Sequence, residues 1–305
     1  MADKFIAAHE GGWRNRKHAQ QWEATLRKHA APLRDKPVDE INTGHVLACL
    51  SPIWSVVPET ASRVRARIEA VIASAAVAGH IPEDRPNPAR WANWLDLMLP
   101  NPRKVGKPRG NHKALDYRDL PAFMARLTGT DTVPARALQF TILTCARTGE
   151  ALGMRWEEVS FDKAVWTVPA WRMKMGKPHD VPLSDAALDI LRSQEAARGK
   201  NPFIFAGRPQ RPLSAMAMSM LLRRMKIEAT VHGMRSAARS WMADQGVAFE
   251  LAEAALAHMV GNAVVRAYQR SSMLERRRPV LAAWAAFVTG EADDNVVPLR
   301  RGASQ

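Results

Sequence analysis

The spacing of apolar positions predicts helices along the first hundred residues. Apolar side chains recur every three to four positions among charged and amide residues, the periodicity of a helix with one buried face. This pattern covers residues 13–29, 38–50 and 59–78. A short tryptophan-rich segment, residues 91–99, follows them. We therefore expect residues 1–100 to form a small, all-helical domain.

Beyond residue 114 the pattern alternates between helical and extended periods. Helical periodicity covers residues 116–127, 133–152, 184–191, 215–225, 231–243, 249–258, 263–268 and 273–287. Short runs of β-branched and aromatic residues predict strands at 159–161, 164–168 and 179–183. We expect a mixed, mainly α domain with a small antiparallel β-sheet over residues 114–290, followed by a polar tail at 291–305.

The segment between the two predicted domains, residues 101–113, is basic and unsuited to a helix. Proline and glycine interrupt it, and it contains no acidic residue. Its basic residues are Arg103, Lys104, Lys107, Arg109 and Lys113. Two interpretations stay open: a solvated interdomain linker, or a linker whose cations also lie against phosphate groups.

The charge of the chain favours a polyanionic partner. Lys and Arg number 44 against 30 Asp and Glu, which gives a net charge of +14 and a pI near 10.4. The excess is shared, with a net charge of +6 in residues 1–116 and +8 in residues 117–305. No single basic amphipathic helix dominates, as it would in a protein that binds an anionic membrane surface. We therefore expect both domains to bind nucleic acid.

The sequence lacks the signatures of several functional classes. No apolar stretch approaches a membrane span, the N-terminus has no signal-peptide core, and Cys49 and Cys145 show no metal-ligand spacing. The motifs HExxH, GxSxG and GxxxxGK[ST] are absent. We expect a cytoplasmic, nucleoid-associated protein that uses no metal or cofactor, in which fixed side chains supply positive charge.

The second predicted domain contains residues that could supply this positive charge. Arg147 ends an apolar helix, while His232 and Arg235 are three residues apart and share one helical face. His258 ends the next helix, and Tyr268 follows ten residues later. Taken singly, each is more often a capping, structural or half-buried residue. Their order along the chain is what suggests a common site.

Four segments carry a resemblance to a known family. They are RTGEALGMRWEEV from Arg147, WRMKMGKPHDVPLS from Trp171, HGMRSAARSW from His232 and LAHMVGNAVVRAYQRS from Leu256. These segments resemble the motifs of tyrosine recombinases, in particular integrases of satellite phages and genomic islands. The resemblance covers residues 110–290 well and residues 1–100 more weakly. It implies a SAM-like, helical core-binding domain followed by a mostly helical catalytic domain.

The resemblance also implies roles for individual residues. Arg147 and Arg235 match the family's two phosphate-binding arginines, and Tyr268 matches its nucleophile. Lys174 matches the general acid, with Lys177 on the same turn as its rival. His232 and His258 match the two remaining positions, which contact the phosphate, and either could accept the tyrosine proton. Glu150 matches the acidic residue that supports the first arginine.

The reaction implied is strand exchange without metal or ATP. Tyr268 would form a 3′-phosphotyrosyl link, and a 5′ hydroxyl would reverse the step, for integration or excision of a mobile element. The implied partners are double-stranded DNA at attachment core sites, contacted by the basic linker residues and Lys177, and accessory bending and excision factors. The protein is expected to be monomeric off DNA and a homotetramer on two duplexes.

Some alternatives stay open. The first is a type IB topoisomerase-like relaxing enzyme, and the second is a catalytically silent DNA-binding or accessory protein. Integrases of this type also carry a further N-terminal domain for arm sites, whereas this chain begins at or near the core-binding domain. Whether such a domain is naturally absent or was removed bears on site choice and on direction.

Overall fold

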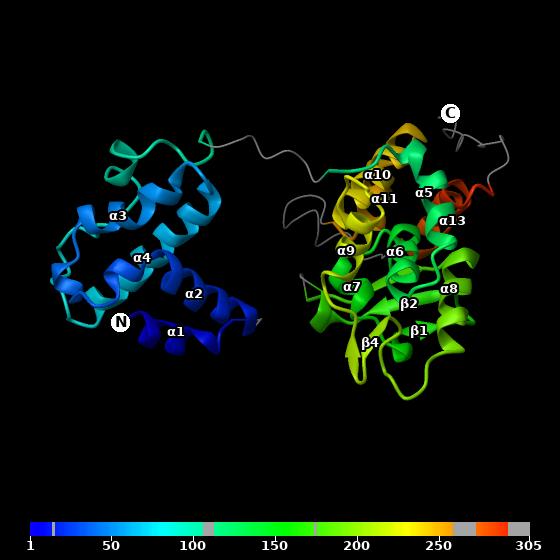
Figure 1. Cartoon of the computed structure of the whole chain (residues 1–305), viewed down its shortest axis with the longest axis horizontal. Helices are drawn as coiled ribbons and strands as arrows, with labels where there is room; N and C mark the ends of the chain where they lie inside the picture. Colours follow the sequence, from blue (N-terminus) through cyan, green and yellow to red (C-terminus); the bar gives the residue numbers. More distant parts are fainter. Residues whose placement is uncertain (14–15, 106–112, 174–175, 259–272, 292–305) are drawn as a thin grey trace, which may run out of the picture. The chain divides into compact units, whose positions relative to one another are not determined.

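The chain divides into two compact units, Met1–Arg109 and Gly110–Gln305 (Figure 1). The computed structural model describes residues 1–13, 16–105, 113–173, 176–258 and 273–291. Within these residues, no helix is long and apolar enough to cross a membrane.

The first unit is all-helical, as its apolar spacing predicts. Its helices are α1 (Ala2–Glu10), α2 (Arg16–His29), α3 (Thr43–Trp54) and α4 (Pro58–Val77). Helix α4 packs against α3 and against α2 (Figure 1). Val46, Leu50, Val64 and Leu95 are fully buried between these elements. Helical spacing therefore placed the core of this unit correctly.

Two details of the first unit differ from the prediction. The helix expected over residues 38–50 begins only at Thr43, because Asn42 caps it: the Asn42 side chain accepts from the His45 amide at 3.1 Å. Helix α1 was not predicted, since it has no buried residue and hence no strong apolar stripe. It is held by aromatic contacts, with the Phe5 and Trp22 ring centroids 5.2 Å apart.

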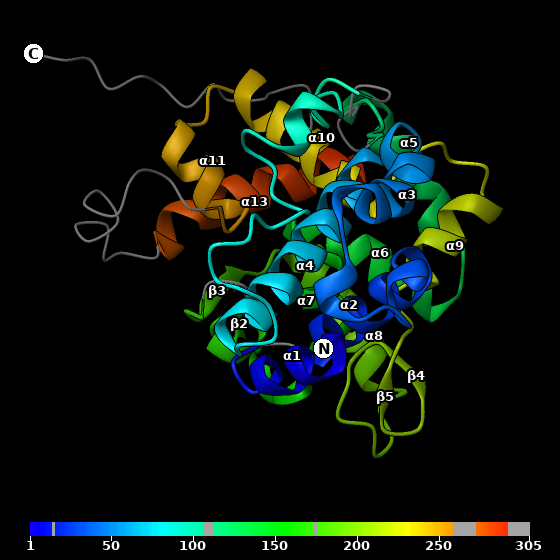
Figure 2. The same ribbon diagram turned by 90° about the vertical axis from the view of Figure 1, so that its left-hand side faces the viewer.

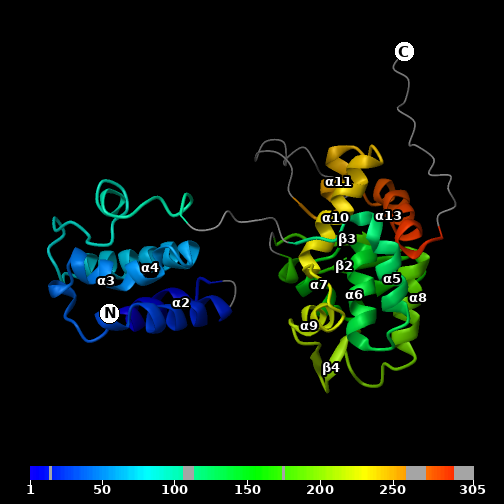
Figure 3. The same cartoon turned by 45° about the horizontal axis from the view of Figure 1, so that its top comes forward.

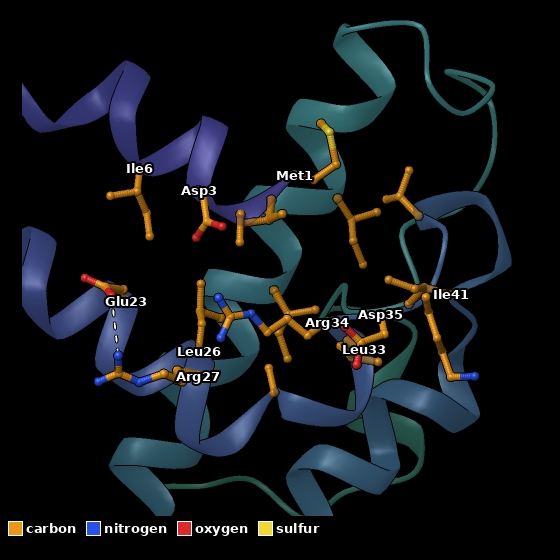
Figure 4. A pocket seen from close by; sticks show the side chains of 17 residues that line it. Met1, Asp3, Ile6, Glu23, Leu26, Arg27, Leu33, Arg34, Asp35 and Ile41 are labelled. Carbon is orange, nitrogen blue, oxygen red and sulfur yellow. Dashed lines mark hydrogen bonds and ion pairs between the residues drawn. The ribbon is translucent and has the colours of Figure 1, made fainter.

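A cavity of about 240 Å³ lies in this first unit. Figure 4 shows apolar side chains such as Leu26 and Ile41 along its wall, and the exposed ion pair between Glu23 and Arg27 at 3.5 Å. The cavity brings together no set of nucleophilic or acid–base side chains like the one described below for the second unit.

The second unit is mainly helical with two small antiparallel sheets. Its helices are α5 (Leu120–Thr128), α6 (Val133–Thr144), α7 (Thr148–Leu152), α8 (Asp185–Glu195), α9 (Ala217–Arg224), α10 (Val231–Asp244), α11 (Phe249–Ala255) and α13 (Leu274–Thr289). Its strands are β1 (Val159–Ser160), β2 (Val165–Val168), β3 (His179–Pro182), β4 (Ala206–Arg208) and β5 (Arg211–Pro212). The larger sheet has the order β1-β2-β3, with Trp166 opposite Val181. The mainly α fold with a small antiparallel sheet is confirmed.

Helix α6 forms the centre of this unit. Most of its residues are buried, and it packs against α5, α8, α9 and α13. Trp284 of α13 donates from its indole Nε1 to the carbonyl oxygen of Ile142 at 2.9 Å. Figures 2 and 3 show α11 beside α13, and Figure 3 also shows α13 along α5 and α8. Residues of α7 and α11 therefore share one hydrophobic core with α6 and α13.

The prediction of one helical region over residues 133–152 is wrong. The structure divides it into α6 and α7, because Cys145 adopts a left-handed conformation with φ 53°. That conformation ends α6 and turns the chain so that Arg147 becomes the N-cap residue of α7. The hairpin β4–β5 was not predicted, and the helix expected at 263–268 lies outside the described residues.

Candidate active site

The first arginine, Arg147, is fixed by a carboxylate three residues along the chain. The Glu150 Oε2 atom accepts from the Arg147 backbone amide at 2.9 Å, and Oε1 accepts from its Nη1 at 2.8 Å. The Glu150 side chain is 8% exposed and the Arg147 side chain 30%. Because the carboxylate both caps α7 and pairs with the guanidinium, it orients the arginine while leaving part of it accessible.

The second arginine, Arg235, lies on α10 and is only 4% exposed. Its Nη1 donates to the carbonyl oxygen of Cys145, and its Nη2 donates to that of Leu256 at 2.6 Å. Burial, and next the charge of Arg147, lower the pKa of Arg235. The like charge of Arg147 thus disfavours the charged form of Arg235, and an anion bound by both guanidinium groups would offset this repulsion.

Two non-glycine residues in left-handed conformations supply carbonyl groups to these arginines. Cys145 has φ 53° and Ala257 has φ 49°. The Cys145 carbonyl accepts from Arg235, and the Ala257 carbonyl accepts from Nη2 of Arg147 at 2.9 Å. Such conformations carry a steric cost for residues with a Cβ and cluster at functional sites. Cys145 is 1% exposed and belongs to the core, and burial raises the pKa of its thiol to about 12, which disfavours the reactive thiolate.

His258 follows the end of α11 and contacts both neighbouring charges. Its Nδ1 lies 2.8 Å from Glu253 Oε2, and its Nε2 lies 3.2 Å from Nη2 of Arg235. Glu253 also accepts from Nε of Arg239 at 2.7 Å. The imidazole therefore lies between a carboxylate and the buried guanidinium.

The start of α10, which carries His232 and Arg235, is packed closely against the chain that enters the second unit. Thr230 caps this helix by accepting from the Gly233 amide at 2.9 Å, and its own amide donates to the Lys113 carbonyl at 2.8 Å. A Cβ at Gly233 would lie 2.9 Å from Cα of Ala114, so a side chain there would force the backbones apart. His232 itself is exposed in the first turn of α10.

A buried ion pair ties the β2–β3 connection to α7. Nη1 of Arg172 donates to Glu158 Oε1 at 2.6 Å, and its Nη2 donates to the Glu150 carbonyl oxygen. The Arg172 and Glu158 side chains are 8% and 5% exposed. A Cβ at Gly153 would lie 2.8 Å from Nη2 of Arg172, so the glycine makes room for the guanidinium. The connection thus starts from a fixed point next to the helix that follows Arg147.

The structure brings together Arg147, Glu150, Arg235 and His258, with His232 exposed at the start of the same helix as Arg235. Lys177 is exposed on the turn before β3, Lys113 pairs with Glu228 at 3.0 Å, and Arg103 and Lys104 are exposed in the first unit. Lys174, Tyr268, Lys107 and Arg109 lie outside the described residues. Over the described residues, no group of three or more His, Cys, Asp or Glu is placed to hold a metal ion.

Four charged residues of this region were not predicted from the sequence: Arg172, Glu158, Arg239 and Glu253. Arg239 had a usable signal, because it lies four residues after Arg235 and therefore on the same face of α10. Arg172 and Glu158 had none, since they are 14 residues apart and meet only through the fold.

Comparison with known proteins agrees with this arrangement. Residues 1–93 match the phage integrase central domain, and residues 113–275 match the phage integrase family. Prophage integrase IntA of Escherichia coli strain K12 is 38% identical over 184 residues, which are 58% of this chain and 45% of IntA. Prophage integrase IntZ of the same strain is 30% identical over 98% of this chain and 73% of IntZ. The chain thus spans less than half of IntA and about three quarters of IntZ.

Solved structures share the fold. A lambda integrase dimer bound to a core site superposes with a TM-score of 0.64 at 18% identity, covering 85% of this chain and 94% of that one. A lambda integrase tetramer bound to a Holliday junction gives a TM-score of 0.66 at 17% identity, covering 86% and 77% of the two chains. With both segments of the chain matched in order, and its two arginines converging beside His258, the protein belongs to the phage integrase family of tyrosine recombinases.

Proposed function

We propose that this protein is a site-specific DNA recombinase that cleaves and rejoins double-stranded DNA through a covalent phosphotyrosine. The observation that carries the proposal is the convergence of Arg147 and Arg235, each oriented by acceptors from other segments of the chain. Guanidinium groups match the geometry of phosphate oxygens and stay charged near neutral pH. The site is therefore suited to a phosphodiester.

In the proposed reaction the two arginines bind the non-bridging oxygens of the scissile phosphate. Negative charge on these oxygens grows in the pentavalent transition state, so fixed cations stabilise that state more than the substrate. Each such contact contributes roughly 3–4 kcal/mol to lowering the barrier in comparable sites. Glu150 serves as the support that keeps Arg147 in place.

The proposed nucleophile is Tyr268. Its phenol oxygen forms a bond to phosphorus while the bond from phosphorus to the 5′ oxygen breaks, which leaves a 3′-phosphotyrosyl link. Lys174 is the proposed general acid that protonates the leaving 5′ oxygen, with Lys177 as the alternative. His232 or His258 takes up the phenol proton. Attack by the 5′ hydroxyl of a partner strand reverses these steps, so the bond energy is conserved.

The proposed partners follow from the family and the charge. Residues 1–100 would act as the core-binding domain and residues 114–290 as the catalytic domain. Arg103, Lys104, Lys107, Arg109 and Lys113 of the linker, together with Lys177, would contact the DNA backbone. The proposed assembly is a tetramer on two duplexes, helped by accessory bending and excision factors, and the relatives' names suggest a mobile element as the element recombined.

A nicked suicide duplex that blocks religation tests the chemistry. In EDTA, the wild-type protein should give a covalent protein–DNA band on a denaturing gel, and Tyr268→Phe should give none. Equal bands would place the nucleophile elsewhere. No band with either protein, despite tight binding, would favour the silent DNA-binding alternative. A requirement for paired specific sites separates a recombinase from a relaxing enzyme of the topoisomerase IB type.

Salt dependence tests the DNA contacts separately. Each phosphate neutralised releases counterions and contributes about −0.9 to the slope of log K against log salt concentration. For a core-site duplex we expect a slope steeper than about −4. A nearly flat slope would contradict binding through both basic units.

A further inference from the structure

His258 is held by one residue, Glu253, at two points. The His258 backbone amide donates to the Glu253 carbonyl oxygen at 2.9 Å, and its Nδ1 lies 2.8 Å from Glu253 Oε2. The first contact is the six-to-one hydrogen bond that closes a helix end through a left-handed residue, here Ala257. The backbone turn and the side-chain contact together fix both the position and the ring plane of the histidine.

Glu253 is itself fixed by a cation from the neighbouring helix. Its Oε1 accepts from Nε of Arg239 at 2.7 Å, and the Arg239 guanidinium lies over the Phe249 ring, 5.3 Å from its centroid. Burial acts to raise the pKa of Glu253, but the hydrogen bonds from Arg239 and His258 outweigh it, and the net shift is downward. The carboxyl group is therefore ionised and can only accept hydrogen bonds.

The partners of both ring nitrogens define the tautomer of His258. An ionised carboxylate at Nδ1 requires that Nδ1 carry the proton. Nη2 of Arg235, 3.2 Å from Nε2, is a donor only, so Nε2 faces it with its lone pair. Among the described residues, Arg147 is a further charge close to this turn, and it donates to the Ala257 carbonyl at 2.9 Å.

We propose that Glu253, supported by Arg239, is a positioning residue that holds His258 as the Nδ1–H tautomer, with the lone pair of Nε2 directed at Arg235. A carboxylate behind an imidazole orients the ring and stabilises the imidazolium that forms when the other nitrogen takes up a proton. The inference extends the proposed function, because it assigns His258 a defined role at the phosphate site.

Position 253 requires a group with two acceptor oxygens, which a carboxylate has and a carboxamide lacks. Glu253 accepts from Arg239 at one oxygen and from His258 at the other. A glutamine has only one oxygen, so its amide group would face either the Arg239 donor or the Nδ1–H donor. Glu253→Gln therefore breaks one of the two contacts while it keeps the size of the side chain.

Histidine ring nitrogens report their protonation directly in nitrogen-15 NMR. The full chain, labelled at histidine, should show His258 as the Nδ1–H tautomer near neutral pH, assigned by loss of its signals in His258→Gln. Glu253→Gln should shift it toward the Nε2–H tautomer. Glu250→Gln is the matched control: it removes the same charge from an exposed position of α11 and should leave the His258 signals unchanged. An Nε2–H tautomer in the wild type would overturn the proposal.

The suicide duplex supplies the second measurement. Glu253→Gln should slow formation of the covalent complex roughly tenfold or more at unchanged duplex affinity, which is less than the roughly 10²–10⁴-fold that a general base itself contributes. Glu250→Gln should react at the wild-type rate. Equal rates in both variants would contradict the assigned role. Absence of any covalent complex in the wild type would reject the proposed function, whereas the NMR result would still decide whether Glu253 sets the tautomer.

Discussion

The carbonyl oxygen of Ala257 accepts a hydrogen bond of 2.9 Å from Nη2 of Arg147, a residue 110 positions earlier in the chain. Arg235 makes the reciprocal connection, because it donates to Cys145, 90 positions earlier. Each arginine is thus oriented by a backbone segment that borders another residue of the site. Both accepting carbonyl groups belong to residues in the left-handed conformation, with φ 53° at Cys145 and φ 49° at Ala257.

The left-handed conformation of Ala257 can be tested by stability. A Cβ in this conformation costs roughly 1–2 kcal/mol, and glycine removes that cost but loses more backbone entropy on folding. Ala257→Gly should therefore raise the free energy of unfolding by up to about 1 kcal/mol. Ala254→Gly, within α11, should lower it by about 1 kcal/mol. Urea denaturation measures the free energy of unfolding of both variants. Equal losses in the two would contradict a steric cost of the left-handed conformation at Ala257.

Replacing Arg235 by lysine should show whether the site needs only the positive charge or also the shape of the guanidinium group. The guanidinium reaches the Cys145 and Leu256 carbonyls and Nε2 of His258 together, which a single ammonium group cannot do. We expect Arg235→Lys to slow covalent complex formation by about 10²–10³-fold. Arg192→Lys, at an exposed arginine of α8, should keep the wild-type rate in the same single-turnover assay. A loss below tenfold in Arg235→Lys would show that charge alone suffices.

The buried pair of Arg172 and Glu158 should be important for stability. Removal of one partner leaves an uncompensated buried charge, which costs about 3–5 kcal/mol. Arg172→Met should therefore lower the free energy of unfolding by about that amount. Arg192→Met breaks the exposed pair with Asp189 and should change it by less than about 1 kcal/mol. Chemical denaturation of both variants provides the measurement, and similar small effects would argue against a buried anchor.

The stability of the β3 region should depend on pH through His179. Burial, and next the charge of Arg277, lower the pKa of His179 from 6.5 to about 4. Between these values the unfolded chain binds a proton that the folded protein excludes, so stability is full above pH 6.5 and decreases as the pH falls toward 4. The resulting loss in the free energy of unfolding is at most about 3 kcal/mol, at 1.36 kcal/mol per unit of the pKa difference.

Hydrogen exchange of the β3 amides between pH 7 and 4 measures this effect. His179→Gln, which cannot be protonated, should lose this part of the pH dependence. His80→Gln, at an exposed histidine of the first unit, should retain it. The assignment fails if His179→Gln and the wild type weaken equally on acidification.

The positions of most helices along the chain, and the order of the proposed site residues, could be predicted from the sequence. Helical spacing identified α4 and the bulk of α10, and it placed His232 and Arg235 on one helix because local periodicity determines which side chains share a face. The break between α6 and α7 could not be predicted. Cys145 has no glycine-like preference for φ 53°, and its carbonyl contacts Arg235, a residue 90 positions later in the chain.

The sequence by itself determined the motifs, the mainly helical class and the residues with which to build a phosphate site, since these depend on residue type and near-neighbour spacing. Apart from Glu150, which the family motif implied as the support of Arg147, the tertiary structure alone decided which groups orient them. Glu253 and Arg239 meet across two helices, and Arg172 of the β2–β3 connection reaches Glu158 and the Glu150 carbonyl in earlier segments of the chain. Such pairings depend on the packing of α6, α10 and α11 around one core, and no local pattern in the chain records them.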